Sequence, residues 1–143
     1  MSRSRLFPIL TAVAILAAAS SAYAQTAVHE NAASALLRGK GLLQQGHYRK
    51  AAAEFERASE LAGGSCAECL LGVGRAYSGA GQLDAAIQVT RMGLALVSGP
   101  DESAAAYNQL GSLLALKGDR DAAEEAFRKA RIQTEQAASS SAP

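Results

Sequence analysis

The sequence predicts an all-α fold built from three helix-turn-helix repeats, with about six helices in total. The main observation is a repeated phrase, in which a glycine is followed seven residues later by a second glycine and five residues after that by an alanine. The second glycines of the three copies, Gly46, Gly81 and Gly118, are separated by 35 and then 37 residues. The composition agrees, because alanine dominates and tryptophan is absent. Arrays of this period stack into one continuous core and usually bind proteins rather than transform substrates.

The third copy shows how a repeat forms its first helix. Tyr107, Leu110 and Leu114 fall on one face at helical spacing. Gly118 breaks this pattern and suits the left-handed conformation that ends many helices. Asp119 follows at the position from which a side chain caps the next helix. The sequence therefore predicts a helix, a tight turn and a second helix.

The second helix of the third copy carries an apolar stripe. Ala123 and Phe127 lie four residues apart and face the same side. Gly111, on the first helix, removes a side chain where the two helices approach each other, and Phe127 fills the space beside it. Glu124 occupies the slot that holds Ile87 in the second copy. A polar residue there suits water, so the array is expected to end after three repeats.

The three phrases resemble the tetratricopeptide repeat family over about residues 32–131. The first copy departs from the family pattern at Arg38, where a core leucine is usual, which leaves Leu37 as the candidate for that role. The second copy departs at Thr90, where an aromatic residue is usual, and at Gly93, where alanine is usual. The matching residues are Gly39, Leu42, Gly46, Tyr48, Ala51, Phe55, Ala58 and Leu61 in the first copy, and Leu70, Val73, Gly74, Tyr77, Gly81, Ala86 and Ile87 in the second.

The resemblance implies a right-handed α-solenoid and a simple division of the chain. We expect a repeat domain over residues 32–134, with repeats at about 32–65, 66–100 and 101–134. A lead-in of residues 25–31 precedes this domain. Residues 135–143 are rich in alanine and serine and are expected to form a disordered tail.

Residues 1–24 have the features of a secretory signal peptide. Arg3 and Arg5 precede a short apolar stretch, and Ala22-Tyr23-Ala24 is a cleavage site of the small-x-small type. An uncleaved membrane anchor is the alternative, although the apolar stretch is short for a membrane span. We therefore expect an exported bacterial protein, periplasmic or secreted, with no membrane insertion after signal cleavage.

Charge and motifs exclude several classes of function. Cleavage would remove two arginines from a chain with 14 Lys and Arg and 13 Asp and Glu, which leaves a formal charge of −1. This balance gives no reason to expect nucleic-acid binding. The chain shows no nucleophile elbow, phosphate-binding loop or cluster of metal ligands. We therefore expect no enzyme activity, no cofactor and no metal.

Cys66 and Cys69 open the second repeat. Ser65 and Glu68 form a capping-box pattern, which predicts that Cys66 takes the first helical position. Residues three apart on a helix have Cα atoms about 5 Å apart, within the range of a disulfide. A local disulfide or inert thiols are the main interpretation. A redox site is the alternative, because a helix N-terminus lowers the pKa of a thiol, and a zinc site would need two further ligands.

The main functional hypothesis is an exported, non-catalytic adaptor or scaffold that binds a protein or peptide partner. A thiol-disulfide protein that uses Cys66 and Cys69, with the repeats recruiting its substrate, is the alternative. Self-association into a structural assembly is also open. The family resemblance implies that the first helices of successive repeats line a concave groove, and that this groove holds the partner.

The resemblance also implies which residues line the groove. Some relatives grip a terminal carboxylate with a lysine–asparagine–arginine clamp. We expect Lys40 and Arg75 to lie near each other and to pair with an acidic group or with backbone carbonyls. The clamp slots hold Leu36, Lys40, Gly72, Ala105 and Gln109 instead. The implied groove residues are Leu36, Lys40, Leu43, Gln44, Leu71, Arg75, Ser78, Asn108, Ser112 and Leu116.

Overall fold

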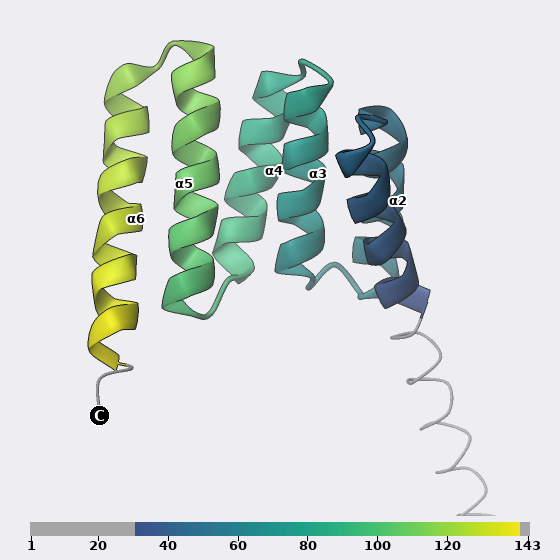
Figure 1. Cartoon of the computed structure of the whole chain (residues 1–143), viewed down its shortest axis with the longest axis horizontal. Helices are drawn as coiled ribbons and strands as arrows, with labels where there is room; N and C mark the ends of the chain where they lie inside the picture. Colours follow the sequence, from purple (N-terminus) through teal and green to yellow (C-terminus); the bar gives the residue numbers. More distant parts are fainter. Residues whose placement is uncertain (1–30, 141–143) are drawn as a thin grey trace, which may run out of the picture.

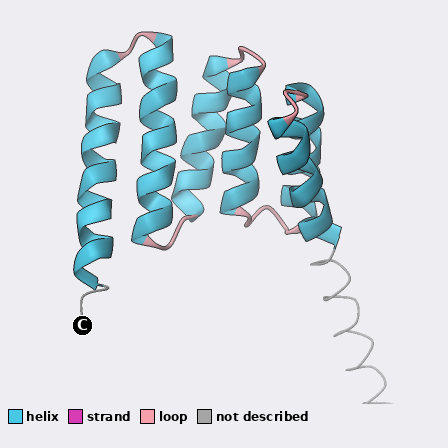
Figure 2. Cartoon of the chain, viewed as in Figure 1, coloured by secondary structure: helices cyan, strands magenta, loops and turns pink. Residues whose placement is uncertain are grey.

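The computed structural model describes residues 31–140, and most of these are helical (Figures 1 and 2). A helix over residues 31–44 comes first. The signal peptide, its cleavage site and residues 25–30 of the lead-in lie outside the described residues and stay predictions. The helices that follow are α2 (Tyr48–Leu61), α3 (Ala67–Gly79), α4 (Leu83–Leu96), α5 (Pro100–Lys117) and α6 (Arg120–Ser140).

The helices lie side by side in a row, each antiparallel to the next (Figure 1). Consecutive helices pack against each other from α2 to α6, and α3 also contacts α5. Residues 31–140 contain no strand. The predicted all-α solenoid of three helix pairs is therefore confirmed.

Three glycines form the turns inside the helix pairs. Gly46, Gly81 and Gly118 have φ angles of +74°, +78° and +92°. This left-handed region is costly for residues with a Cβ atom, so the spacing of the glycines in the sequence marks the turns. The carboxylate of Asp119 accepts a hydrogen bond from the backbone N–H of Ala122 at 3.2 Å. The predicted cap of α6 is thus present.

Two further glycines allow the helices of a pair to approach closely. A Cβ atom on Gly111 would lie 2.7 Å from the ring of Phe127. A Cβ atom on Gly39 would lie 2.8 Å from the ring of Phe55 in the same way. Each aromatic ring therefore packs on the bare backbone of the partner helix. The cluster that joins the second repeat to the third consists of Ala86, Ile87, Leu110, Leu113, Leu114, Ala123 and Ala126.

The structure corrects the interpretation of Leu37 as a core residue. Leu37 is 71% exposed, whereas Ala35 and Gly39 on the same helix are buried. Residues two apart on a helix point in nearly opposite directions, so turning Ala35 and Gly39 inward leaves Leu37 in solvent. Arg38 does not enter the core either. Its Nε pairs with a carboxylate oxygen of Glu54 on α2 at 2.9 Å.

The structure also corrects the prediction of a disordered tail. Helix α6 continues to Ser140, so residues 135–140 are helical. The last buried residue of this helix is Ala130, and the hydroxyl of Thr134 donates to its carbonyl oxygen. Extending an existing helix needs no new nucleus, and alanine has the highest helix propensity. The alanine-rich sequence therefore continues the helix without burying a further side chain.

The outward side of α6 carries charged residues. Glu124 and Arg131 are both exposed, as expected for the last repeat of an array. Among the described residues, no helix combines the length and the apolar character that crossing a membrane requires.

Candidate functional site

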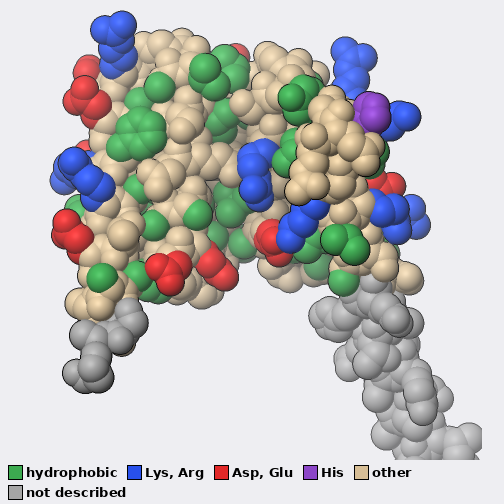
Figure 3. Space-filling model, in the orientation of Figure 1, with side chains coloured by type: hydrophobic (Ala, Val, Ile, Leu, Met, Phe, Trp, Pro, Cys, Tyr) green, Lys and Arg blue, Asp and Glu red, His purple; other side chains and the backbone are tan. Residues whose placement is uncertain are grey.

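A shallow cavity lies on the first helices of the second and third repeats, α3 and α5, and is called here the α3–α5 groove. Its volume is about 410 Å³. Basic and acidic side chains are interspersed over the face drawn in Figure 3. Four of the predicted groove residues, Arg75, Ser78, Ser112 and Leu116, line this cavity. The full lining consists of these four with Ala105, Gln109 and Leu113.

The two predicted groove cations have different environments. The Nζ of Lys40 pairs with a carboxylate oxygen of Glu68 at 2.6 Å. Arg75 is exposed and forms no ion pair with the described residues. Of the two, only Arg75 lines the α3–α5 groove. The groove therefore offers one cation for a partner where the sequence predicted two.

Three predicted groove leucines serve packing. Leu36 and Leu43 are half-buried against the core cluster that joins α2 to α3. Leu71 reaches α4, where a Cβ atom on Gly93 would lie 3.1 Å from its side chain. These leucines hold neighbouring helices together, so less of their surface remains for a partner. Gln44 is exposed near the end of the 31–44 helix.

Asn108 lines a second cavity, called here the α6 cavity, and not the α3–α5 groove. The α6 cavity has a volume of about 580 Å³. Apart from Asn108 on α5, its lining comes from α6. The lining residues are Asn108, Asp121, Glu124, Glu125, Phe127, Arg128 and Arg131.

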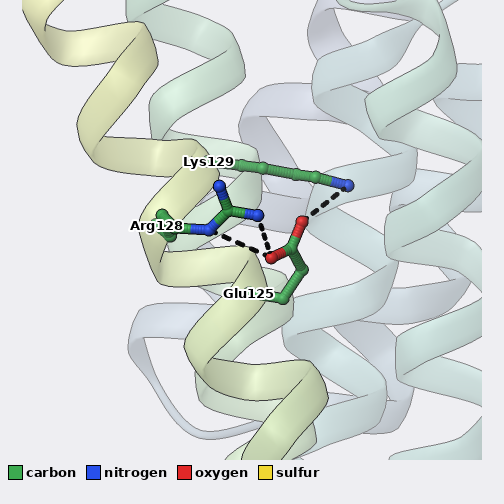
Figure 4. A network of polar contacts seen from close by, with 3 residues as sticks. All are labelled: Glu125, Arg128 and Lys129. Atoms are coloured by element: carbon green, nitrogen blue, oxygen red, sulfur yellow. Dashed lines mark hydrogen bonds and ion pairs between the residues drawn. The ribbon is translucent and has the colours of Figure 1, made fainter.

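Several charges beside the α6 cavity pair with one another (Figure 4). Glu125 accepts hydrogen bonds from Arg128 and also lies 3.5 Å from the Nζ of Lys129. The hydrogen bond from Arg128 lowers the pKa of the Glu125 carboxyl group. Lys129 also lies over the ring of Tyr107, 5.9 Å from its centroid. Glu125, Arg128 and Lys129 are therefore paired, whereas Asp121, Glu124 and Arg131 of the cavity lining form no ion pair with the described residues.

Gln109 is a functional candidate that sequence reasoning treated only as a substituted clamp position. Its Nε2 donates to the backbone oxygen of Leu71 at 2.9 Å and to the Oγ1 of Thr90 at 3.0 Å. Thr90 is fully buried. A Cβ atom on Gly74 would lie 2.3 Å from that Oγ1, so the glycine makes the room. These four residues, called here the Gln109 junction, tie α5 to α3 and α4. The sequence feature that points to this junction is Thr90, a polar residue at a position where an aromatic residue is usual.

A second polar tie joins α2 to α3. The hydroxyl of Tyr77 donates a hydrogen bond to a carboxylate oxygen of Glu56. This hydrogen bond, together with partial burial and the negative charge of Glu56, raises the pKa of the Tyr77 phenol. Tyr77 also packs against two of the core clusters, so one side chain connects the first repeat to the second.

Cys66 and Cys69 form a disulfide, with Cα atoms 5.2 Å apart. The predicted capping box is wrong in detail. Cys66 is itself the N-cap, and its Sγ accepts from the backbone N–H of Cys69 at 3.1 Å. The hydroxyl of Ser65 donates instead to the carbonyl oxygen of Ala62 at the end of α2. Helix α3 therefore begins at Ala67, one residue later than predicted.

The disulfide is part of the core. Cys69 is 1% exposed and clusters with Ala35 and Ala58, so the bridge packs against both helices of the first repeat. Within residues 31–140, no group of three or more histidine, cysteine, aspartate or glutamate side chains could hold a metal ion. The described residues thus favour a structural role for the two cysteines.

Comparison with known families supports the tetratricopeptide repeat assignment. A tetratricopeptide repeat model matches residues 104–130, the helix pair of the third repeat. Comparison with curated proteins gives no match.

Solved structures resemble the fold. MamA is similar with a TM-score of 0.69 and 24% identity over 78% of this chain, which spans 63% of the MamA chain. The second tetratricopeptide domain of Spaghetti (RPAP3), bound to an HSP90 peptide, gives a TM-score of 0.68 and 20% identity over 78% of this chain and 98% of that domain. The tetratricopeptide domain of Arabidopsis FLU gives 0.67 and 24% over 76% of this chain and 98% of that domain. At these identities the likeness concerns the fold.

Proposed function

We propose that the protein is an exported, non-catalytic adaptor that binds a protein or peptide segment in the α3–α5 groove. The observation that carries the proposal is the composition of that groove. It combines an exposed apolar side chain, Leu116, with a cation, Arg75, that has no ion-pair partner among the described residues. Apolar anchors with few polar groups are typical of peptide-binding grooves.

Two further observations support the proposal. The Spaghetti domain, which has the same fold, was solved in complex with a peptide. The Cys66–Cys69 disulfide favours export, because disulfides persist in oxidising compartments and are rare in the cytosol.

A photo-crosslinking experiment in cells tests the groove. A photoreactive amino acid replaces Leu116, which is 67% exposed in the groove, or Met92, which is 53% exposed on α4 outside it. We expect a discrete adduct with a partner protein from position 116, a weak or absent adduct from position 92, and loss of the adduct in Arg75→Glu. Equal adducts from both positions, or an adduct that survives Arg75→Glu, would show that this groove is not the binding surface.

The thiol-disulfide alternative has a separate test. Reduced protein and its Cys66→Ser variant are compared for catalysis of insulin reduction. Because Cys69 is buried in the core, we expect both to leave the rate at the background level. A rate above background that the Cys66→Ser variant lacks would support the redox function instead.

A further inference from the structure

We propose that the α3–α5 groove selects a side-chain carboxamide, that of a glutamine or an asparagine, in preference to a carboxylate. This inference rests on the proposed function, because it names what the groove binds. It follows from the hydrogen-bonding state of three groove residues, Gln109, Ser112 and Arg75.

The side-chain amide of Gln109 has a fixed orientation. The backbone oxygen of Leu71 can only accept a hydrogen bond, so the group that faces it must be the amide nitrogen. The second N–H of that nitrogen goes to Thr90. Both donors are therefore used inside the protein, and the carbonyl oxygen of Gln109 is what the side chain can offer to a partner. No donor among residues 31–140 pairs with that oxygen.

Ser112 repeats this arrangement one turn later on α5. Its hydroxyl donates to the backbone oxygen of Asn108 at 2.9 Å. A hydroxyl has a single hydrogen, so the oxygen of Ser112 is an acceptor for as long as this bond is made. Gln109 and Ser112 both line the groove. The α5 wall of the groove therefore presents hydrogen-bond acceptors.

The α3 wall has the opposite character. Arg75 is an exposed guanidinium that can only donate, and it forms no ion pair with the described residues. A ligand that fits both walls needs an acceptor facing α3 and a donor facing α5. An amide has both, on two atoms bonded to the same carbon: its carbonyl oxygen can accept from Arg75 while its N–H donates to Gln109 or Ser112.

A carboxylate fits only one of the two walls. It can accept from Arg75, even with both oxygens, but it has no hydrogen to donate, so the carbonyl oxygen of Gln109 would stay unpaired. Gln109 cannot rotate to present its nitrogen, because rotation would aim its oxygen at the carbonyl of Leu71.

The test uses matched synthetic peptides on an array and the purified protein as the cell produces it. The peptides are short, acetylated at the N-terminus and closed at the C-terminus as a methyl ester, which is neither a carboxylate nor a carboxamide, with random apolar flanks around a central glutamine, asparagine, glutamate or aspartate. We expect glutamine and asparagine peptides to bind about five- to tenfold more tightly than their acidic counterparts, because the acids leave a polar pair unmade. We expect Arg75→Glu to abolish this binding.

A variant reverses the predicted preference. In Gln109→Lys, an ammonium group can still donate to Leu71 and Thr90, but the acceptor is gone and a positive charge is added. We expect this variant to prefer glutamate and aspartate peptides. Gln88→Lys makes the same substitution at an exposed position of α4 outside the groove, and it should keep the wild-type preference.

The outcomes separate the two proposals. Wild-type protein that binds acidic peptides as tightly as their amide counterparts overturns the carboxamide inference and leaves the groove as a peptide site. A complete absence of peptide binding overturns both. If Gln109→Lys fails to fold, as judged by its circular dichroism, the affinities of the wild-type protein for the four kinds of peptide still test the carboxamide inference.

Discussion

At the scale of single residues, Gly74 controls how the second and third repeats meet. A Cβ atom at this position would lie 2.3 Å from the hydroxyl oxygen of Thr90 and 2.9 Å from the amide nitrogen of Gln109. Thr90 is fully buried and cannot move into solvent. The junction thus depends on the absence of one methyl group.

Gly74→Ala is predicted to destabilise the protein, with Gly41→Ala as the matched control. Both substitutions gain about 0.5–1 kcal/mol from helix propensity. A Cβ atom on Gly41 meets nothing within 4 Å, so this variant should be neutral or slightly more stable. At Gly74, overpacking costs about 1–3 kcal/mol and a displaced hydrogen bond costs about 1 kcal/mol more. Thermal melts should show a melting temperature lower by roughly 4 °C or more for Gly74→Ala. Equal melting temperatures for the two variants would refute this account.

At the scale of helices, polar ties across the packed faces supplement a core of small side chains. Tyr77 on α3 holds Glu56 on α2, and Lys117 at the end of α5 pairs with Asp84 at the start of α4, with 2.5 Å between Nζ and Oδ1. The contribution of the Tyr77–Glu56 hydrogen bond depends on pH, because this bond raises the pKa of the Tyr77 phenol. A group whose pKa is raised in the folded state adds stability below its unfolded pKa and loses it as the pH rises through the folded value.

The stability that Tyr77 adds should therefore disappear in alkali. We expect Tyr77→Phe to be less stable than the wild type near pH 7, and the difference to shrink as the pH rises beyond about 10, the ordinary pKa of tyrosine. Denaturant unfolding at several pH values measures this difference in the free energy of unfolding. Tyr48→Phe is the control, because the Tyr48 hydroxyl makes no hydrogen bond within residues 31–140. A Tyr77→Phe difference that stays constant with pH would contradict the prediction.

The helices also show where sequence reasoning stops. The glycines at the turns and close approaches could be identified from the sequence, because only a residue without a side chain satisfies those positions. The end of α6 could not be predicted, because alanine and serine occur both in helices and in disordered tails. In the groove, Arg75 lines the cavity, but the pairing of Lys40 with Glu68 depends on distances between helices that periodicity does not fix.

At the scale of the whole molecule, the array is a row in which packing is mostly between neighbours. Helices α3, α4 and α5 have a packed helix on both sides, and the Gln109 junction ties them together. Helix α6 has a neighbour on one side, and its residues beyond Ala130 are not buried. In such arrays, stability is approximately a sum of repeat and interface contributions, so the centre should open last.

Protection of backbone amides from hydrogen exchange should therefore be highest in the middle of the row of helices and should fall towards the end of α6. We expect the amides of α3 and α4 to approach the protection of global unfolding, about a thousandfold or more for a stability of about 5 kcal/mol. Amides of residues 132–140 should exchange fastest within α6. Mass spectrometry of exchanged peptides measures this gradient. Uniform protection along α6 would contradict this prediction.

The Gln109 junction has a consequence for how such a protein can evolve. A methyl group at position 74 would collide with the threonine hydroxyl and the glutamine amide, so positions 74, 90 and 109 cannot drift independently. Among homologous arrays, these three positions should covary as a unit, with glycine, threonine and glutamine present together or replaced together. A lineage that acquires a different ligand preference at position 109 must also rebuild a buried contact on another helix. Changes in partner should therefore arise in coupled steps, through intermediates of reduced stability.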